Sequence, residues 1–383
     1  MALNYTMDDL LRALVEHGGS DLHIRVGLPP LVRIRGDLTP LNYPPLTPED
    51  AEELMFSLMN EERKRKFLET NELDMAYSVK DVARFRVNAL RQQGYVGGVM
   101  RCIPYEIKTL EQLGLPPVIK DIVLRPRGLV LVTGPTGSGK TTTLAAMIRY
   151  INETTAKHII TIEDPIEFVH EDIKSIVQQR EVHEDTHSFQ NALKHVLRQA
   201  PDVILVGELR DLETIHLAIT AAETGHLVFG TLHTTDAAQT VDRAIDVFPP
   251  DQQAQIRMQL SVTILAIICQ TLLPTADRQS RIAAFEIMIA TPAIRSLIRE
   301  GKTHQLPTEI QQGGELGMQA LDGHLVQLLV SGKVTYEEAL LKCGNPKEFE
   351  MRVEKAFSQR GLPLPTQMTS QAPASGQAGQ QRK

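Results

Sequence analysis

Eight residues, from Gly134 to Thr141, constrain the fold of this chain more than any other segment. They read Gly-Pro-Thr-Gly-Ser-Gly-Lys-Thr and follow the pattern G-x-x-x-x-G-K-[ST] at every position. An apolar run, residues 128–133, comes directly before them, and a helix-forming run, residues 142–151, follows. A glycine-rich turn between a buried strand and a helix is typical of α/β folds with a parallel sheet. We therefore expect an α/β domain built around this loop.

The same loop predicts the binding of a nucleoside triphosphate. Glycines let the backbone N–H groups curl around a phosphate, and the start of the following helix adds a partial positive charge. In this pattern Lys140 reaches the β- and γ-phosphates, and the hydroxyl of Thr141 ligates Mg²⁺. The expected nucleotide-binding residues of the loop are Gly134, Pro135, Thr136, Gly137, Ser138, Gly139, Lys140, Thr141 and Thr142.

Strands and helices alternate after the loop. Expected strands cover residues 128–133, 158–162, 203–207 and 227–231, and expected helices cover 140–152, 188–200, 211–224 and 236–246. Short apolar strands joined by helices predict a mostly parallel sheet that is covered on both faces.

The first hundred residues read as a separate α+β unit. Its expected helices cover residues 8–16 and 48–69, and its expected strands cover 31–35, 83–89 and 96–103. The domain prediction is an N-terminal domain over 1–103, a linker over 104–127, a nucleotide-binding domain over 128–360, and a disordered tail over 361–383 that is too polar to build a core.

Composition excludes several classes of protein. The net charge of −7 offers no broad basic surface, so we expect no nucleic-acid partner. The three cysteines are widely separated, which disfavours a disulfide framework or a zinc site and suits a reducing compartment. The N-terminus lacks the pattern of a signal peptide. Residues 258–273 are uncharged but too short and polar to span a bilayer, and we read them as a buried helix. We expect a cytoplasmic protein.

Two expected strands end in acidic residues. Glu163, Asp164 and Glu167 follow the first, where parallel sheets bind ligands, although a solvated turn explains their position equally well. Glu208 follows the strand over 203–207 in a Walker-B arrangement and would serve Mg²⁺ directly or through water. Asp211 suits the N-cap of the next helix.

Two histidines and three arginines are further candidates. His226 and His233 bracket the strand over 227–231, and His233 falls at the edge of the sheet beside the expected phosphate site. Arg84 and Arg86 project from one face of a strand, with Arg101 on its expected neighbour. Such a cluster could complete a phosphate site of a neighbouring subunit. From sequence alone, a solvated sheet face is the favoured reading of the three arginines.

A short helix over 292–300 carries its own boundaries. Thr291 suits the N-cap, Pro292 the first helical position and Gly301 the residue after the end. Arg295 and Arg299 lie four residues apart, so we expect a packed helix with a solvated basic side.

Together these residues resemble one family, the secretion ATPases of type IV pili and type II secretion, and within it the pilus retraction branch. The resemblance runs from residue 19 to about residue 349. It covers the loop at 134–141, the acidic segment 162–168, the strand ending at Glu208, the histidine segment ending at His233, and two retraction-type stretches at 293–300 and 313–319.

The resemblance implies a PAS-like N-terminal domain and a RecA-like ATPase domain, assembled as a homo-hexamer that hydrolyses ATP with Mg²⁺ to retract pili in twitching motility. Glu167 would polarise the attacking water, with Glu163 beside it, and Glu208 would serve Mg²⁺. His226 and His233 would link nucleotide state to conformation. The resemblance implies an inner-membrane pilus platform protein as the partner, with a retraction-motor paralogue as a further candidate, at the inner face of the cytoplasmic membrane.

Three positions depart from the family pattern: Ala200, Ser296 and Phe285 replace a common acid, asparagine and histidine, and none removes a catalytic group. Three rival readings are less favoured. A pilus-extension or type II secretion ATPase usually carries four clustered cysteines, whereas the three cysteines here are scattered. An accessory paralogue that modulates a separate motor is disfavoured by the intact Lys140, Glu167 and Glu208. A DNA motor would need a basic, aromatic stripe, which the sequence lacks.

Overall fold

The structure is a computed structural model that describes residues 3–34, 36–80, 82–103 and 106–365. The chain divides into two compact units. The first comprises Met1–Ile107 with Thr161–Asp172 and Val177–Ala192, and the second comprises the rest of the chain. The predicted N-terminal domain, residues 1–103, therefore lies in the first unit together with two later segments. From residue 366 on, the predicted tail lies outside the described residues.

The N-terminal part of the first unit is an antiparallel sheet with helices. Its elements are α1 (Met7–Glu16), β1 (Asp21–Ile24), β2 (Leu31–Ile34), β3 (Asp37–Pro40), α2 (Pro48–Phe56), α3 (Glu61–Thr70), β4 (Glu72–Val79), β5 (Ala83–Gln92) and β6 (Tyr95–Ile103). The strand order is β3-β2-β1-β6-β5-β4. Alternate side chains of β5, including Phe85 and Val87, are buried with Leu10 and Leu14 of α1 in one core.

The single charged helix expected over 48–69 is wrong, because the structure has two helices there. Thr47 caps α2 through a capping box with Asp50, and α2 ends at Phe56. The side chain of Asn60 then accepts a hydrogen bond from the backbone N–H of Arg63 at 2.8 Å and starts α3. A second N-cap inside the segment restarts the helix, because a capping side chain serves the free N–H groups of a new first turn.

The second sheet has seven strands in the order β13-β12-β7-β11-β10-β8-β9. It is built from β7 (Gly128–Thr133), β8 (His158–Glu163), β9 (Ile176–Glu181), β10 (Val203–Val206), β11 (Leu227–Leu232), β12 (Ile264–Pro274) and β13 (Arg281–Ile289). β12, β7, β11 and β10 run parallel, and β13 pairs antiparallel with β12. The mostly parallel sheet confirms the expected α/β fold class.

Helices connect these strands. They are α4 (Val118–Val123), α5 (Lys140–Thr154), α6 (Phe189–Val196), α7 (Leu212–Glu223), α8 (Ala237–Asp246) and α9 (Pro250–Thr263). Asp211 caps α7 as predicted, accepting the backbone N–H of Thr214 at 2.9 Å. α6 ends four residues before the predicted end of its helix, and Ala200 takes a left-handed backbone conformation with φ 49°.

The buried helix expected over 258–273 is wrong. α9 ends at Thr263, and β12 begins at Ile264 and runs through the rest of the segment. Most residues of β12 from Ile264 to Gln270 are buried, because the strand lies between β7 and β13. A strand that is buried on both faces reads as a nearly continuous apolar run, which periodicity alone does not separate from a buried helix.

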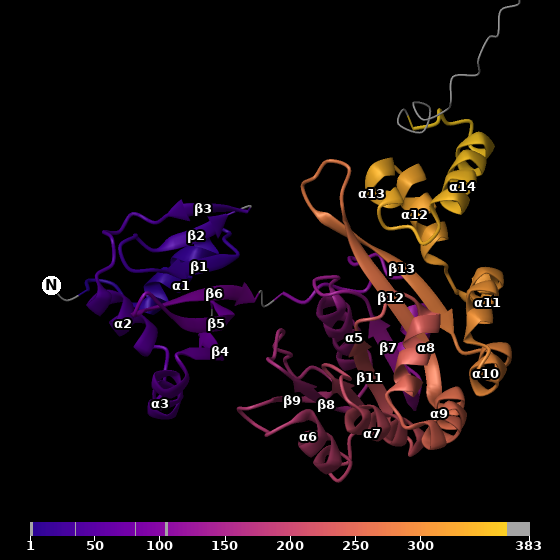
Figure 1. Cartoon of the computed structure of the whole chain (residues 1–383), viewed down its shortest axis with the longest axis horizontal. Helices are drawn as coiled ribbons and strands as arrows, with labels where there is room; N and C mark the ends of the chain where they lie inside the picture. Colours follow the sequence, from indigo (N-terminus) through magenta and orange to yellow (C-terminus); the bar gives the residue numbers. More distant parts are fainter. Residues whose placement is uncertain (1–2, 35, 81, 104–105, 366–383) are drawn as a thin grey trace, which may run out of the picture. The chain divides into compact units, whose positions relative to one another are not determined.

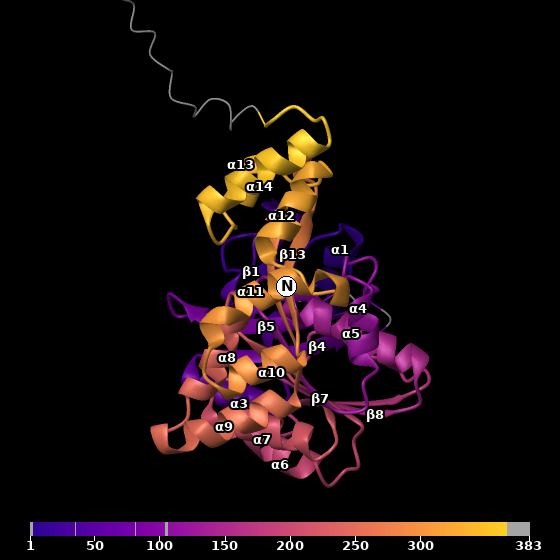
Figure 2. The same cartoon turned by 90° about the vertical axis from the view of Figure 1, so that its right-hand side faces the viewer.

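The chain after β13 is helical. It forms α10 (Pro292–Arg299), α11 (Leu306–Gln312), α12 (Leu321–Val330), α13 (Tyr336–Leu340) and α14 (Pro346–Gln359), with short 3₁₀ turns at Thr303–Gln305 and Gly313–Leu316. The helices α12, α13 and α14 gather beside the β12–β13 hairpin in both views of the second unit (Figures 1 and 2). They share a core that includes Phe349 and Leu325. Within the described residues, no helix combines the length and the apolar character that crossing a membrane requires.

Candidate functional site

The glycine-rich loop, residues 134–139, joins the fully buried strand β7 to the first residue of α5. Three of its glycines have positive φ angles, namely 142° at Gly134, 77° at Gly137 and 89° at Gly139. A Cβ atom at Gly134 would collide with the backbone oxygen of Gln270. Glycine is therefore required at Gly134 both by conformation and by space. The predicted strand-loop-helix unit is present.

The loop has the features of a phosphate cradle. The hydroxyl of Ser138 is buried and has no hydrogen-bond partner among the described residues. The amino group of Lys140 donates to the backbone oxygen of Gly134 at 2.8 Å, so its charge is held at the loop. The first turn of a fifteen-residue helix, α5, adds unpaired N–H groups and a positive dipole end. A triphosphate chain therefore fits the residues of this loop.

Glu208 lies just past the buried strand β10, as predicted. Its carboxylate accepts from Nε2 of His233 at 2.9 Å and forms an ion pair with Arg210. Burial raises the pKa of the Glu208 carboxyl, but the hydrogen bond and charge of Arg210 outweigh it, with His233 adding to them. The pKa is therefore lowered below its ordinary value. Glu208 is thus held as an anion beside two cationic or protonatable groups.

A shallow groove surrounds this carboxylate. Its lining is formed by Glu208, Leu209, Arg210, Leu232, His233, Thr234 and Arg243. The backbone N–H of Leu209 donates to the oxygen of Thr231 at 3.0 Å, which ties the turn after β10 to β11. A Cβ atom at Gly230 would come within 2.6 Å of the Leu209 side chain, so this glycine lets the turn pack closely.

The two predicted histidines lie at opposite ends of β11. Leu232, the last residue of β11, pairs in register with Thr133, so His233 lies at the edge where the glycine-rich loop begins. His226 precedes β11 at the other edge, where its backbone oxygen accepts the N–H of Gly128 at 3.0 Å. Its ring atom Nδ1 lies 2.9 Å from the backbone oxygen of Ala221. Of the two, only His233 lies at the end of the strands where the glycine-rich loop begins.

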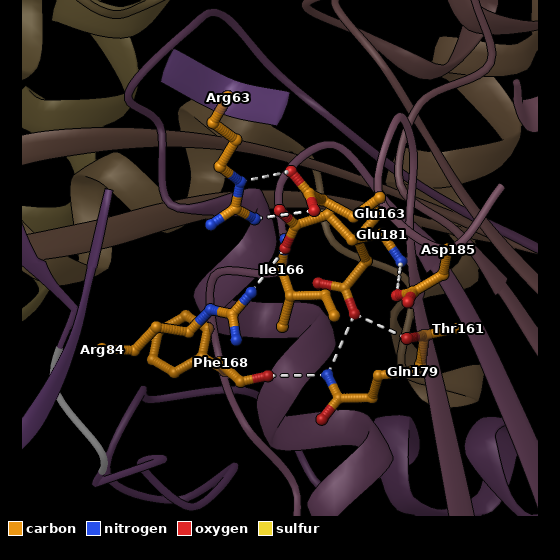
Figure 3. A network of polar contacts seen from close by, with 10 residues as sticks. Arg63, Arg84, Thr161, Glu163, Ile166, Phe168, Gln179, Glu181 and Asp185 are labelled. Atoms are coloured by element: carbon orange, nitrogen blue, oxygen red, sulfur yellow. Dashed lines mark hydrogen bonds and ion pairs between the residues drawn. The ribbon is translucent and has the colours of Figure 1, made fainter. Parts of the chain in front are cut away.

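In the first unit, Glu163 is the last residue of β8 and is 8 % exposed. Its carboxylate accepts the hydroxyl of Thr161 at 2.6 Å and the side-chain amide of Gln179 at 3.1 Å (Figure 3). The backbone N–H of Glu167 also donates to it. Burial raises the pKa of the Glu163 carboxyl against these hydrogen bonds. Glu163 thus braces the turn that carries Glu167.

Two arginines of the first unit contact acids of the segment that follows β8. Arg84 of β5 pairs with Glu181 at 2.5 Å, and the same oxygen of Glu181 accepts the backbone N–H of Ile166 at 3.1 Å (Figure 3). Arg63 of α3 forms two contacts with Glu184, at 3.2 and 2.6 Å. These carboxylates were not candidates from the sequence, because no motif marks Glu181 or Glu184.

The other two predicted arginines differ from Arg84. Arg101 pairs with Asp21 at 2.8 Å, although most of its side chain is exposed. Arg86 stands opposite Arg101 in the β5–β6 register and is exposed. Within the described residues no ion pair involves Arg86. The alternation that placed Arg84 and Arg86 on one face is confirmed.

The structure thus groups the candidates in two sets. The loop residues, Glu208 and His233 belong to the second unit, and Glu163, Glu167 and the arginines belong to the first. Reasoning from sequence missed Gln270, which hydrogen-bonds the loop from β12. The sequence does contain a sign of its role, because Gln270 is a polar residue within the mostly apolar run 258–273. We used that polarity only as evidence against a membrane span.

Comparisons with known proteins place this geometry in context. Residues 7–312 match the family model described as "Type II/IV secretion system protein". The "Type IV pilus retractation ATPase PilT" of Pseudomonas aeruginosa is 53% identical over 341 residues, which cover 89% of this chain and 99% of that protein. The "Type IV pilus ATPase PilU" of the same organism is 45% identical over 347 residues, 91% of each chain.

A solved structure, "Crystal Structure of the Pilus Retraction Motor PilT and Bound ADP", has a TM-score of 0.86 and 47% identity. The match covers 91% of this chain and all of that one. The similarity therefore extends over both units and not only over the glycine-rich loop.

Proposed function

Because this chain belongs to the type II/IV secretion family and is an ATPase, we propose that it hydrolyses ATP to retract type IV pili. The observation that supports this proposal best is the extent of the likeness to retraction motors. It includes the first unit, the ATPase sheet and α10 together. Retraction would return pilin subunits to the membrane and drive twitching motility.

In this proposal the glycine-rich loop binds the phosphates of ATP. Backbone N–H groups of residues 134–139 and the start of α5 would contact the β-phosphate, and Lys140 would exchange its carbonyl partners for phosphate oxygens. Mg²⁺ would be held by the hydroxyl of Thr141 and the carboxylate of Glu208, and would neutralise charge on the phosphates. The lowered pKa of Glu208 suits a cation ligand, because the group stays ionised.

The acidic residues after β8 would orient and polarise the attacking water. Glu167 would orient and polarise the attacking water, while Glu163 would act as a positioning residue through the backbone N–H of Glu167. His233 would respond to changes at Glu208, because its Nε2 is hydrogen-bonded to the Glu208 carboxylate at 2.9 Å. His226 would respond from the opposite edge of the sheet through β11.

We further propose a homo-hexameric ring at the inner face of the cytoplasmic membrane that acts on a pilus platform protein. Arg86 is the favoured contact to a neighbouring subunit's nucleotide, since Arg84 and Arg101 are engaged by Glu181 and Asp21. A paralogous motor could share the work. The second candidate function is that of an accessory motor subunit. The 45% identity to the "Type IV pilus ATPase PilU" supports it only in that a second pilus ATPase also resembles this chain.

The test is a count of surface pili in the native host, with Lys140→Ala as the only copy of the gene. Cells that are crowded with pili and do not twitch are expected, because assembly continues unopposed. Lys355→Ala, on the exposed surface of α14, is the matched control and should leave both readouts unchanged. Cells without surface pili would mean that the motor drives pilus extension. Normal pili and normal movement would favour the accessory role.

A further inference from the structure

Gln270 lies next to the glycine-rich loop although 132 residues separate it from its partner Ser138. It belongs to β12, where the preceding residue, Cys269, pairs in register with Thr133, the last residue of β7. The side chain is therefore carried by the strand next to β7, at the point where the loop leaves the sheet. Gln270 is 4% exposed.

The side-chain amide of Gln270 makes two buried hydrogen bonds. Its Nε2 donates to the backbone oxygen of Ser138 in the loop at 2.6 Å. Its Oε1 accepts the hydroxyl of Thr143, in the first turn of α5, at 2.8 Å. One planar group thus connects the loop, the helix and the neighbouring strand, and both of its polar ends are satisfied.

The loop also packs directly on β12. A Cβ atom at Gly139 would lie 3.1 Å from Nε2 of Gln270, and one at Gly134 would collide with the backbone oxygen of Gln270. Glycine is therefore required at Gly134 by this contact as well as by its positive φ angle, and Gly139, also with a positive φ angle, leaves only tight room beside the Gln270 side chain.

We propose that Gln270 is a positioning residue for the nucleotide phosphates, holding the glycine-rich loop against β12 and α5 in the shape that receives them. A loop that binds anions must direct its N–H groups toward the ligand, so its carbonyl groups need partners elsewhere. Gln270 supplies that partner for Ser138. The inference rests on the ATPase function proposed above and adds a residue that the motif does not include.

The expected kinetic effect depends on the states in which the two hydrogen bonds of Gln270 are present. They are made in the protein before ATP arrives and are retained in the transition state, so they favour both bound states equally. Removing them raises the KM and the nucleotide Kd and leaves kcat nearly unchanged. A direct phosphate ligand or a group that acts on water would instead lower kcat.

Gln270→Leu in the full-length protein tests this inference. The variant should bind a fluorescent ADP analogue about 10-fold more weakly, equivalent to about 1.4 kcal/mol, while its kcat stays within about threefold of the wild type. Thr143→Val removes one of the two bonds at nearly constant volume and should weaken binding by a smaller factor. The double variant should be no weaker than Gln270→Leu, because the two changes remove one shared bond.

Gln319→Leu is the matched control. Gln319 is a partly buried glutamine of the second unit, and like Gln270 it donates from Nε2 to a backbone oxygen, that of Phe285, at 3.0 Å. This control should lower the melting temperature without changing the Kd for ADP. Gln270→Leu and Thr143→Val that melt early but bind ADP as the wild type does would overturn the proposal. Failure of the wild type to bind ADP would instead contradict the proposed function.

Discussion

At the scale of single residues, Glu286 of β13 shows how a carboxyl group can join two helices. Its Oε1 accepts the backbone N–H of Ala237, the first residue of α8, at 2.8 Å, and the backbone of Leu321 at the start of α12 also donates to it. Burial, with the charges of Asp236 and Asp322, raises the pKa of Glu286 to about 7 against these bonds.

This shift predicts a pH-dependent stability. Because the folded-state pKa of Glu286 lies above the unfolded value of 4.5, the neutral carboxyl stabilises the folded protein. This stabilisation is complete below pH 4.5 and is lost as the pH rises through about 7. Glu286→Gln keeps an acceptor for Ala237 but cannot ionise. We expect the free energy of unfolding of Glu286→Gln, relative to wild type, to rise by about 2 kcal/mol between pH 5 and pH 8.

Urea titrations at several pH values measure this difference. Glu354→Gln on the exposed surface of α14 is the control, and its difference from wild type should stay flat across the same range. A flat difference for Glu286→Gln as well would show that the carboxyl of Glu286 titrates alike in the folded and unfolded chains.

Residues whose position follows from a local motif could be placed from the sequence. Lys140, Glu208 and His233 were placed correctly at one edge of the sheet, because a loop after a strand and an acid or histidine after a strand follow from short stretches of sequence. Gln270 and Glu181 could not be found this way. Their partners are 132 and 97 residues away, and only the folded sheet brings them together.

At the scale of elements, α10 illustrates both success and failure of sequence reasoning. Thr291 caps the helix by accepting the N–H of Ile294, Pro292 is its first residue, and Gly301 follows with φ 70°, all as predicted. The solvated basic side is correct for Arg299 but wrong for Arg295. The guanidinium of Arg295 donates to the backbone oxygens of Ser261 and Val262, at 2.7 and 2.5 Å.

Arg295 therefore caps the carboxyl end of α9, where unpaired carbonyl groups and the helix dipole favour a cation. Spacing within α10 does not reveal this contact, since it depends on how α9 lies beside it. The same reason explains the misread segment 258–273: a boundary between α9 and β12 is decided by the neighbours of β12 in the sheet and not by the local pattern.

Replacing Arg295 by leucine should lower the free energy of unfolding by about 2 kcal/mol, because two carbonyl oxygens lose a charged donor. Arg295→Lys should recover part of that loss, since an ammonium group can still donate to the end of α9. Chemical denaturation measures both. Arg299→Leu, on the exposed side of the same helix, is the control and should change stability by less than about 0.5 kcal/mol. An equal loss at both positions would contradict the capping role.

At the scale of the whole molecule, the proposed ring requires that residues of one subunit complete the site of another. Arg86 and Lys140 are the pair that tests this requirement, because they lie in different units of the chain. If Arg86 acts on the nucleotide of a neighbouring subunit, Lys140→Ala and Arg86→Ala damage the same composite site from opposite sides.

Mixing these two inactive proteins should therefore restore ATP hydrolysis. Where the intact loop of an Arg86→Ala subunit meets the intact Arg86 of a Lys140→Ala subunit, a complete site forms. In a random one-to-one mixture about a quarter of the sites are complete, so about a quarter of wild-type turnover is expected from a closed ring with one site per interface. A mixture of Lys140→Ala with Thr141→Ala, both damaged in the loop, should stay inactive. Absence of recovery at every ratio of the first pair would mean that Arg86 serves its own subunit or no site.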